Sequence, residues 1–236
     1  MRKLAAIISE NRKNYAKVLS SLIQDKLTVL ELPKARFEIQ IKEKDLSVNG
    51  VDEVEFMIST NVSEDLKPLA KVASGGEISR VMLAIKTIFA QSDNIDTVIF
   101  DEIDTGISGK ASQSVAEEVG ELAKYMQVIM ITHQAIIASK SDRHIYVTKK
   151  QEDKTSVNIS ILSGEDKLKA IAELAGGEVS AESLEFASGK VSKDWGYEHG
   201  QQTFYKQAHI GVASVFFREY GHRLRACEAF GYHAQE

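Results

Sequence analysis

Two acidic residues follow a short apolar run in this sequence. The run Thr97–Phe100 (TVIF) ends at Asp101 and Glu102, and an apolar strand followed by two acids is typical of phosphoryl-transfer enzymes. In such enzymes the first carboxylate supports Mg²⁺ and the second orients the attacking water. The same pair would also suit a solvated turn after a strand, so neighbouring residues must decide between the two interpretations.

A second apolar run ends in side chains that suit the same chemistry. Val128–Ile131 (VIMI) is followed by Thr132 and His133. The carboxyl ends of neighbouring parallel strands meet at one edge of a sheet, where α/β proteins bind their ligands. His133 could therefore hydrogen-bond a phosphate or the attacking water beside the two acids, although a histidine considered alone is more often structural.

A third group stands at the start of a long apolar-periodic stretch and consists of Ser74, Gly75, Gly76 and Glu77. A serine and two glycines at a helix start provide a hydroxyl, exposed backbone N–H groups and the positive end of the helix dipole, with no β-carbons in the way. This pattern predicts an anion site, with a terminal phosphate as the obvious ligand. Taken alone, it would also suit a flexible loop.

The spacing of apolar residues predicts the elements that position these groups. A helix is expected after Pro68 and a second from Ser108 to Tyr125, with strands at Thr97–Phe100 and Val128–Ile131. Strand, helix and strand in this order predict a parallel βαβ unit. The continuous apolar character of Thr97–Phe100 predicts a strand buried on both faces. The apolar positions of the two helices are Ile78, Val81, Met82, Ile85, Phe89, Val115, Val119 and Leu122.

The N-terminal region predicts a helix followed by a β-hairpin. Arg36–Ile41 and Glu53–Ser59 alternate apolar and polar residues around the turn dipeptide Asn49-Gly50, which is typical of a hairpin with one buried face. Residues 3–30 have the spacing of a coiled-coil seam, but an ordinary amphipathic helix packed on its own domain would have similar spacing. The seam positions are Leu4, Ile8, Asn11, Tyr15, Val18 and Leu22.

The region after the βαβ unit predicts two antiparallel edge strands, His144–Thr148 and Ser156–Leu162, around a charged loop. A helix at Asp166–Leu174 is expected to close at Gly176-Gly177, which acts more simply as a helix C-cap than as a second phosphate site. Beyond about residue 188 the composition changes, because the last 49 residues hold nine of the seventeen aromatic residues and four of the six histidines. We expect this tail to be atypical, and it could be an accessory domain or a non-native or disordered extension.

The motifs together resemble those of a known superfamily. ASGGEISRVMLA, TVIFDEIDTGISG and VIMITH are similar, in order and spacing, to the signature motif, the Walker B strand with its D-loop and the switch-histidine strand of ABC-type ATPases. LPKARFEI, PLAKVASGGEISRVMLAIK, FDEIDTGISG and ELAGGEVSAESLEFA resemble more narrowly the C-terminal part of the RecN family of bacterial DNA repair proteins, which are relatives of the SMC proteins. The resemblance covers roughly residues 1–187.

This resemblance implies an α/β fold, the C-terminal lobe of an ABC/SMC-type P-loop ATPase head with an N-terminal coiled-coil helix stump. It also implies the domain division: an arm stump at 1–30, the head lobe at 31–187 and the atypical tail at 188–236. The resemblance implies that Asp101 supports Mg²⁺, that Glu102 is catalytic and activates the water, and that His133 is the switch histidine. Asp104 and Gly106 would belong to the D-loop. The signature residues Ser74, Gly75, Gly76 and Glu77 would contact ATP bound to an opposite head.

One motif of the superfamily is missing. The sequence contains no G-x-x-x-x-G-K-[ST] phosphate loop, and Gly106–Ala111 only mimics its end. In the family that loop lies in the N-terminal half of the head. The resemblance therefore implies that this chain needs that half, a second head, ATP and Mg²⁺, and that alone it binds ATP poorly or not at all.

The composition limits how the protein could bind DNA and in which compartment it works. The net charge of −5 argues against binding DNA through bulk charge, so we expect DNA contacts to be local. The single cysteine, Cys227, excludes an internal disulfide and fits a reducing compartment. No apolar run is long enough to span a bilayer, which predicts a cytoplasmic protein. The resemblance to DNA repair proteins implies that it is nucleoid-associated and has no membrane partner.

The expected function is ATP hydrolysis between two engaged SMC-like heads in double-strand break repair and recombination. Two alternatives keep the same motifs. One is the ATPase subunit of a transporter, and the other is a non-catalytic interaction fragment of the same head.

Overall fold

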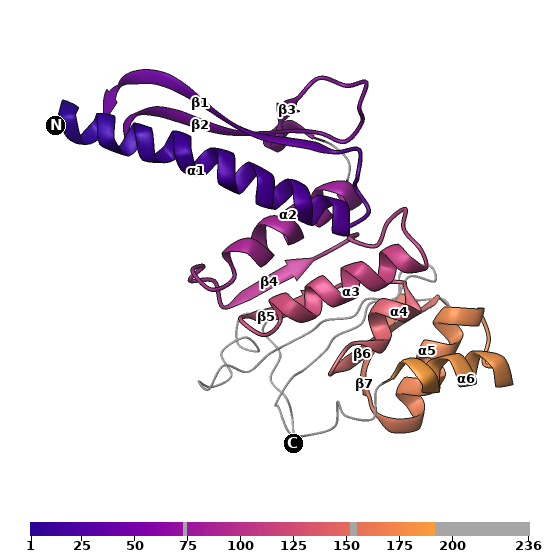
Figure 1. Cartoon of the computed structure of the whole chain (residues 1–236). Coiled ribbons are helices and arrows are strands. Elements are labelled where there is room, and N and C mark those ends of the chain that lie inside the picture. Colours follow the sequence, from indigo (N-terminus) through magenta and orange to yellow (C-terminus); the bar gives the residue numbers. More distant parts are fainter. Residues whose placement is uncertain (73–74, 152–154, 192–236) are drawn as a thin grey trace.

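A computed structural model describes residues 1–72, 75–151 and 155–191 of the chain (Figure 1). The predictions made for Ser74 and for the tail beyond residue 191 lie outside these residues. The first part of the fold contains α1 (Arg2–Val29), β1 (Arg36–Ser47), β2 (Gly50–Ser59), β3 (Lys67–Pro68) and the 3-10 turn η1 (Leu69–Lys71). The middle part contains α2 (Gly75–Phe89), β4 (Thr97–Phe100), α3 (Lys110–Leu122) and β5 (Gln127–Met130). The last part contains α4 (Ala135–Ser139), β6 (His144–Gln151), β7 (Thr155–Leu162), α5 (Gly164–Gly176) and α6 (Ala181–Lys190).

The predicted hairpin is confirmed, with longer strands than the alternation indicated. β1 and β2 pair antiparallel, and Gly50 takes a positive φ of 92° in the turn that joins them. The hairpin lies along α1 (Figure 1), where Asp52 accepts hydrogen bonds from Ser9 Oγ at 2.6 Å and from Arg12 Nη1 at 3.0 Å. These bonds fix the position of the helix on the hairpin.

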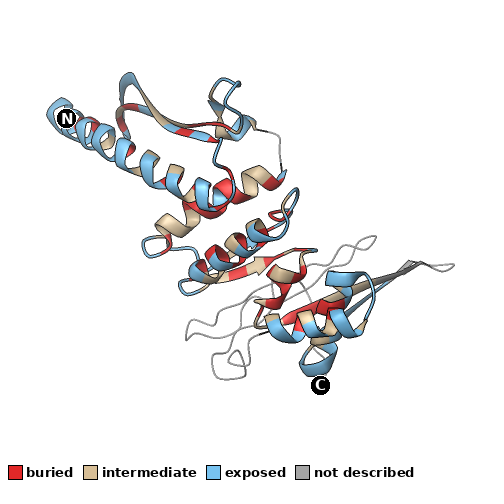
Figure 2. Cartoon of the chain, turned by 45° about the vertical axis from the view of Figure 1, so that its right-hand side comes forward, coloured by how far each residue is buried: buried red, intermediate tan, exposed pale blue. Residues whose placement is uncertain are grey.

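The helix predicted for residues 3–30 is confirmed as α1, but its predicted seam faces away from the chain. Figure 2 shows that α1 is exposed along much of its length. Its buried residues are Ala5, Ser9, Ala16, Ile23 and Leu27. The exposed apolar residues of the seam are Leu4, Ile8, Tyr15, Val18 and Leu22. The described chain therefore leaves an apolar stripe on α1 uncovered, and its pairing with a second helix stays a prediction.

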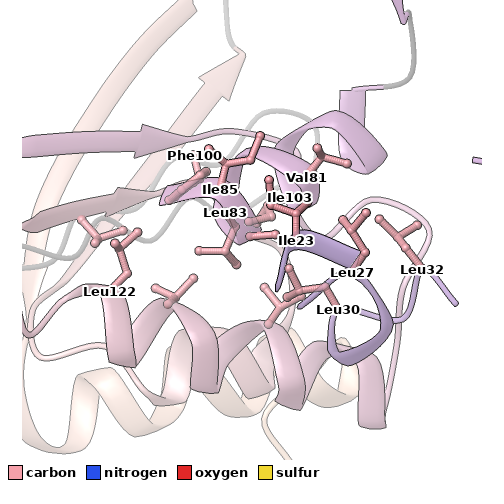
Figure 3. Packing of buried hydrophobic residues seen from close by; sticks show 14 of the residues in the cluster. Ile23, Leu27, Leu30, Leu32, Val81, Leu83, Ile85, Phe100, Ile103 and Leu122 are labelled. Atoms are coloured by element: carbon pink, nitrogen blue, oxygen red, sulfur yellow. The ribbon is translucent and has the colours of Figure 1, made fainter. Parts of the chain in front are cut away.

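The parallel βαβ unit is confirmed, and α3 is shorter at both ends than predicted. β4 and β5 pair in register from Thr97 opposite Gln127 to Phe100 opposite Met130. One hydrophobic cluster joins this pair to α2, α3 and the end of α1 (Figure 3). Full burial of each large apolar side chain contributes roughly 1.5–3 kcal/mol. The cluster includes Ile23, Leu27, Leu30, Val81, Leu83, Ile85, Ile103, Leu122 and Val128.

The prediction that β4 is buried on both faces was wrong. Phe100 points into the core, whereas Ile99 on the opposite face is 54% exposed. Side chains alternate between the two faces of a strand, and α2 and α3 supply the buried contacts of the Phe100 face. Among the described residues β4 pairs only with β5, and the Ile99 face has no comparable cover. Similarly, Met82 of the predicted helix face is exposed, whereas Leu83 and Ala84 are fully buried.

The last part of the fold contains the two predicted strands and the predicted helix, together with α4 and α6, which the sequence analysis did not predict. β6 and β7 pair antiparallel, and α4, α5 and α6 share a small cluster with Ile171 and Ala187 at its centre. α5 ends at Gly177, which has φ 76° and donates its N–H to Glu173 O at 2.7 Å. The second Gly-Gly-Glu stretch is therefore a left-handed helix cap, as predicted. α6 then begins with a capping box made by Ser180 and Ser183.

A buried histidine makes the stability of this part depend on pH. His144 is 0% exposed, and burial, together with the charge of Lys167, lowers its pKa well below the ordinary 6.5. The folded chain therefore keeps His144 neutral at a pH where the unfolded chain binds a proton. The contribution of this group to the free energy of unfolding is therefore complete above pH 6.5, and it falls as the pH drops below 6.5.

We predict that the free energy of unfolding falls between pH 6.5 and 5 with an added slope that approaches 1.4 kcal/mol per pH unit, about the value for one proton. Urea unfolding of the chain at several pH values measures this slope. His144→Gln, which removes the buried ionisable ring, should flatten it. An unchanged slope in the His144 variant would contradict the prediction.

Candidate functional site

The candidate site lies at the carboxyl ends of β4 and β5. The loop of residues 101–109 leaves β4 there, and Thr132 and His133 follow β5. Ile131 N donates to Phe100 O at 2.9 Å, which extends the pairing of the two strands up to the site. The parallel pair therefore brings both predicted groups to one edge of the sheet, as the sequence indicated.

Asp101 and Glu102 are both exposed at this edge. Asp101 Oδ1 accepts the backbone N–H of Glu102 at 3.0 Å, and Glu102 O accepts from Thr105 N at 3.0 Å. Glu102 takes a left-handed φ of 58°, which costs a non-glycine residue about 1 kcal/mol. The tight turn thus holds the predicted catalytic carboxylate on a strained backbone, a feature that is common at functional sites.

Asp104 turns inward and joins the two halves of the site. Its side chain is 2% exposed, and its Oδ2 accepts from Thr132 Oγ1 and, at 2.8 Å, from the backbone N–H of His133. His133 Nδ1 lies 3.2 Å from the same oxygen, and the His133 side chain is 51% exposed. Gln134 Nε2 donates to Ile107 O at 3.1 Å and also ties the loop to the end of β5.

The other side of the loop is held by α2, through residues that the sequence analysis did not select. Ser79 Oγ donates to Asp101 O at 2.8 Å. Arg80, which is 4% exposed, donates from Nη1 to Ile103 O at 3.2 Å and to Thr105 O at 3.1 Å. Burial lowers the pKa of the Arg80 guanidinium, and the charges of Glu77 and Asp104 act in the opposite direction.

The two glycines at the start of α2 pack against the same loop. A β-carbon on Gly75 would collide with Glu102 Oε2, and one on Gly76 would lie 2.9 Å from Thr105 O and 3.0 Å from Glu102 O. Gly76 is buried, and its neighbour Glu77 is partly exposed. The carboxylate of Glu102 thus lies at the positive end of the α2 dipole, where a negative charge is favourable. Gly106, with φ 75°, has open space around it.

The loop offers a carboxylate that could serve as a ligand of Mg²⁺ bound together with a nucleotide. Asp101 is exposed and presents a carboxylate. No group of three or more His, Cys, Asp or Glu side chains in the described part of the chain could hold a metal ion by itself. Mg²⁺ is commonly held by one or two carboxylates together with substrate phosphates, so Asp101 fits as the protein ligand of such an ion.

Known proteins match about three quarters of this chain. The chain is 41% identical over 179 residues to the DNA repair protein RecN of Halalkalibacterium halodurans, and the match covers 73% of this chain and 32% of that protein. It is 39% identical over 190 residues to the DNA repair protein RecN of Bacillus subtilis, covering 73% and 33%. The chain is therefore a homologue of part of RecN. It spans about a third of the length of these RecN relatives, and no protein-family model matches it.

Solved structures support the fold. The Smc head domain with a coiled coil and joint derived from Pyrococcus yayanosii matches with a TM-score of 0.50 and 20% identity, over 72% of this chain and 32% of that one. This likeness confirms the predicted α/β lobe of an SMC-type head and, at this identity, shows the fold alone. Among the described helices of this RecN homologue, none is long and apolar enough to cross a membrane.

The packing of the two glycines predicts different costs for two neighbouring substitutions. Gly76→Ala places a methyl group against backbone atoms of the loop and should destabilise the chain by about 1–3 kcal/mol. Gly75→Ala meets only the end of the flexible Glu102 side chain, which can turn away, and the better helix propensity of alanine offsets part of the cost.

Urea unfolding of both variants, with the unchanged chain as reference, measures this difference. Equal loss of stability in the two variants would show that the loop does not pack against Gly76 as described.

Proposed function

We propose that the chain forms the C-terminal lobe of an SMC-like ATPase head that hydrolyses ATP between two engaged heads. The observation that carries this proposal is the convergence of the α2 start, the Asp101–Glu102 turn and His133 at one edge of the β4–β5 pair. Homology to RecN supports the ATPase class, and the fold of an SMC head supports the arrangement.

The proposed roles follow from the position of each group. Asp101 supports Mg²⁺, which neutralises phosphate charge when it is bound. Glu102 activates and orients the attacking water, and His133 contacts that water or the phosphate. Both side chains are accessible at the same edge of the sheet.

The start of α2 is the proposed contact with ATP on the opposite head. Ser74, Gly75, Gly76 and Glu77 would face its terminal phosphate, because backbone N–H groups and the helix dipole favour an anion there. An arriving phosphate would displace the Glu102 carboxylate from Gly75. The D-loop residue Gly106, which lies in open space, is then free to approach the second head.

Exposed apolar surfaces support the proposal that an N-terminal lobe completes this head. Ile99 is exposed on the outer face of β4, and Val157, Ile159 and Ile161 form an exposed row along β7. Contiguous exposed apolar residues mark surfaces that are covered in an assembly. We infer that the lobe with the phosphate loop covers these strands and that the α1 seam pairs with a second helix of a coiled-coil arm.

The biological setting is proposed from the relatives. Their name, DNA repair protein RecN, supports a role in DNA double-strand break repair and recombination, with DNA as a partner and a cytoplasmic, nucleoid-associated location. A transporter ATPase subunit would instead need a membrane partner. A non-catalytic interaction fragment would keep the same surfaces without hydrolysing ATP.

We predict that the chain alone does not hydrolyse ATP and that mixing it with a separately made N-terminal half carrying a phosphate loop produces hydrolysis. Glu102→Gln should reduce the rate by roughly 10²–10⁴-fold, the usual contribution of a positioned acid or base, while ATP binding persists. Steady-state phosphate release measures both effects.

Glu121→Gln is a matched control, because it removes a carboxylate from the exposed surface of α3. Equal hydrolysis by the Glu102 variant would overturn the assignment of that carboxylate. No hydrolysis by a mixture that contains a folded complex would favour the interaction-fragment alternative.

A further inference from the structure

Two neighbouring residues of α2 bind the loop that follows β4. Ser79 Oγ donates to Asp101 O at 2.8 Å. Arg80 Nη1 donates to Ile103 O at 3.2 Å and to Thr105 O at 3.1 Å. The three acceptors are peptide carbonyls of alternate residues of the loop. These bonds therefore hold the loop backbone itself, whatever its side chains do.

The two acids of the loop that point to chemistry lie between these carbonyls. Glu102 stands between the first and the second carbonyl, and Asp104 stands between the second and the third. Glu102 has the left-handed φ of 58°, and a strained conformation of this kind persists only where surrounding contacts hold it. Without the bonds to α2, the backbone of Glu102 could relax and move its carboxylate.

Stability alone does not explain why a guanidinium is buried at this position. Arg80 is 4% exposed, and its Nε atom is buried with no hydrogen-bond partner among the described residues. A buried donor without a partner is unfavourable, and an apolar side chain of similar size would avoid this cost. The charges of Glu77, in the first turn of α2, and of Asp104, in the loop, both act on the guanidinium. Arg80 therefore interacts electrostatically with both of the elements that it joins.

The same face of α2 brings the start of the helix against the loop. Gly76, Ser79 and Arg80 are three and four residues apart, so they lie on one side of the helix. A β-carbon on Gly76 would lie 2.9 Å from Thr105 O, which is one of the carbonyls that Arg80 binds. The start of α2 and the loop are therefore held together as one unit.

We propose that Ser79 and Arg80 are positioning residues that hold the Glu102 carboxylate in place for hydrolysis and connect it to the start of α2. This proposal rests on the proposed function, in which Glu102 activates water and the start of α2 contacts ATP on the opposite head. A phosphate that binds at the start of α2 then acts on the loop through these two residues. The three hydrogen bonds lie within the chain, so they can be tested without nucleotide.

The first experiment measures the order of the loop in the chain alone. Arg80→Met keeps an apolar stem but removes two of the three bonds. We expect it to raise the hydrogen-exchange rates of the Thr105 and His133 amides about tenfold or more relative to the amides of β5, because a bond from a charged donor contributes at least that factor to a local equilibrium. These two amides report on the loop, since they donate to Glu102 O and to Asp104 Oδ2.

Lys86→Met is the matched control. It removes a cation from the same helix, but Lys86 pairs with Asp93 rather than with the loop, so the relative exchange rates of the loop amides should stay as they are. Equal relative rates in Arg80→Met and the unchanged chain would overturn the proposal. Arg80→Lys, which keeps the charge without the shape of the guanidinium, should give a smaller increase. If only the lysine variant folds, unchanged rates in that variant would overturn the proposal in the same way.

The second experiment tests the consequence for hydrolysis in the mixture with the N-terminal half. Arg80→Met should lower kcat roughly a hundredfold with little change in KM, because the orientation of a catalytic group is lost while ATP contacts remain. Lys86→Met should keep both constants. An unchanged kcat in Arg80→Met would overturn the positioning role. If the unchanged mixture does not hydrolyse ATP while Arg80→Met loosens the loop, the proposed function fails and the attachment of the loop to α2 stands.

Discussion

The arrangement of the site depends on the buried guanidinium of Arg80. The loop of residues 101–109 has no secondary structure to hold it before α3 begins at Lys110, so its shape must come from contacts with its neighbours. Two Arg80 hydrogen bonds to loop carbonyls, together with the close approach of Gly76, fix the loop to α2. Burial of a cation is tolerated because carbonyl oxygens and the charge of Asp104 compensate it. The position of His133 then follows from Asp104.

The same loop is connected to the N-terminal helix. Lys26 Nζ of α1 lies 2.7 Å and 2.8 Å from the two carboxylate oxygens of Glu118 in α3, and α3 follows the loop directly. The pair is partly buried, so solvent screens it less than a surface pair. α1, α2 and α3 also share one hydrophobic cluster. A change in the direction of α1 therefore acts on a packed unit that includes the site, rather than on an isolated helix.

Sequence reasoning predicted most elements because apolar spacing follows the period of the backbone. It also predicted that Asp101, Glu102 and His133 lie at one edge of the sheet, because strand ends converge in parallel sheets. Arg80 escaped it, since a cation inside a helix is usually solvated. Arg80 lies four residues after Gly76, which places both residues on the helix face that meets the loop. This spacing is the sequence feature that could have identified Arg80. The left-handed backbone of Glu102 and the inward turn of Asp104 arise from long-range contacts, which spacing along the chain does not encode.

The wrong prediction that β4 is buried on both faces identifies an apolar surface that the described chain leaves exposed. A strand with apolar residues on both faces is favourable only where both faces are covered, yet Ile99 is largely exposed while Phe100 is buried. The row of Val157, Ile159 and Ile161 on β7 has the same character. Full burial of such a side chain contributes roughly 1.5–3 kcal/mol, and these four side chains, which are 54–60% exposed, forgo about half of it. Cover over Ile99 in an assembly would stabilise β4, the strand that leads directly into Asp101 and Glu102. Burial of this face and order in the loop after β4 would then be energetically linked.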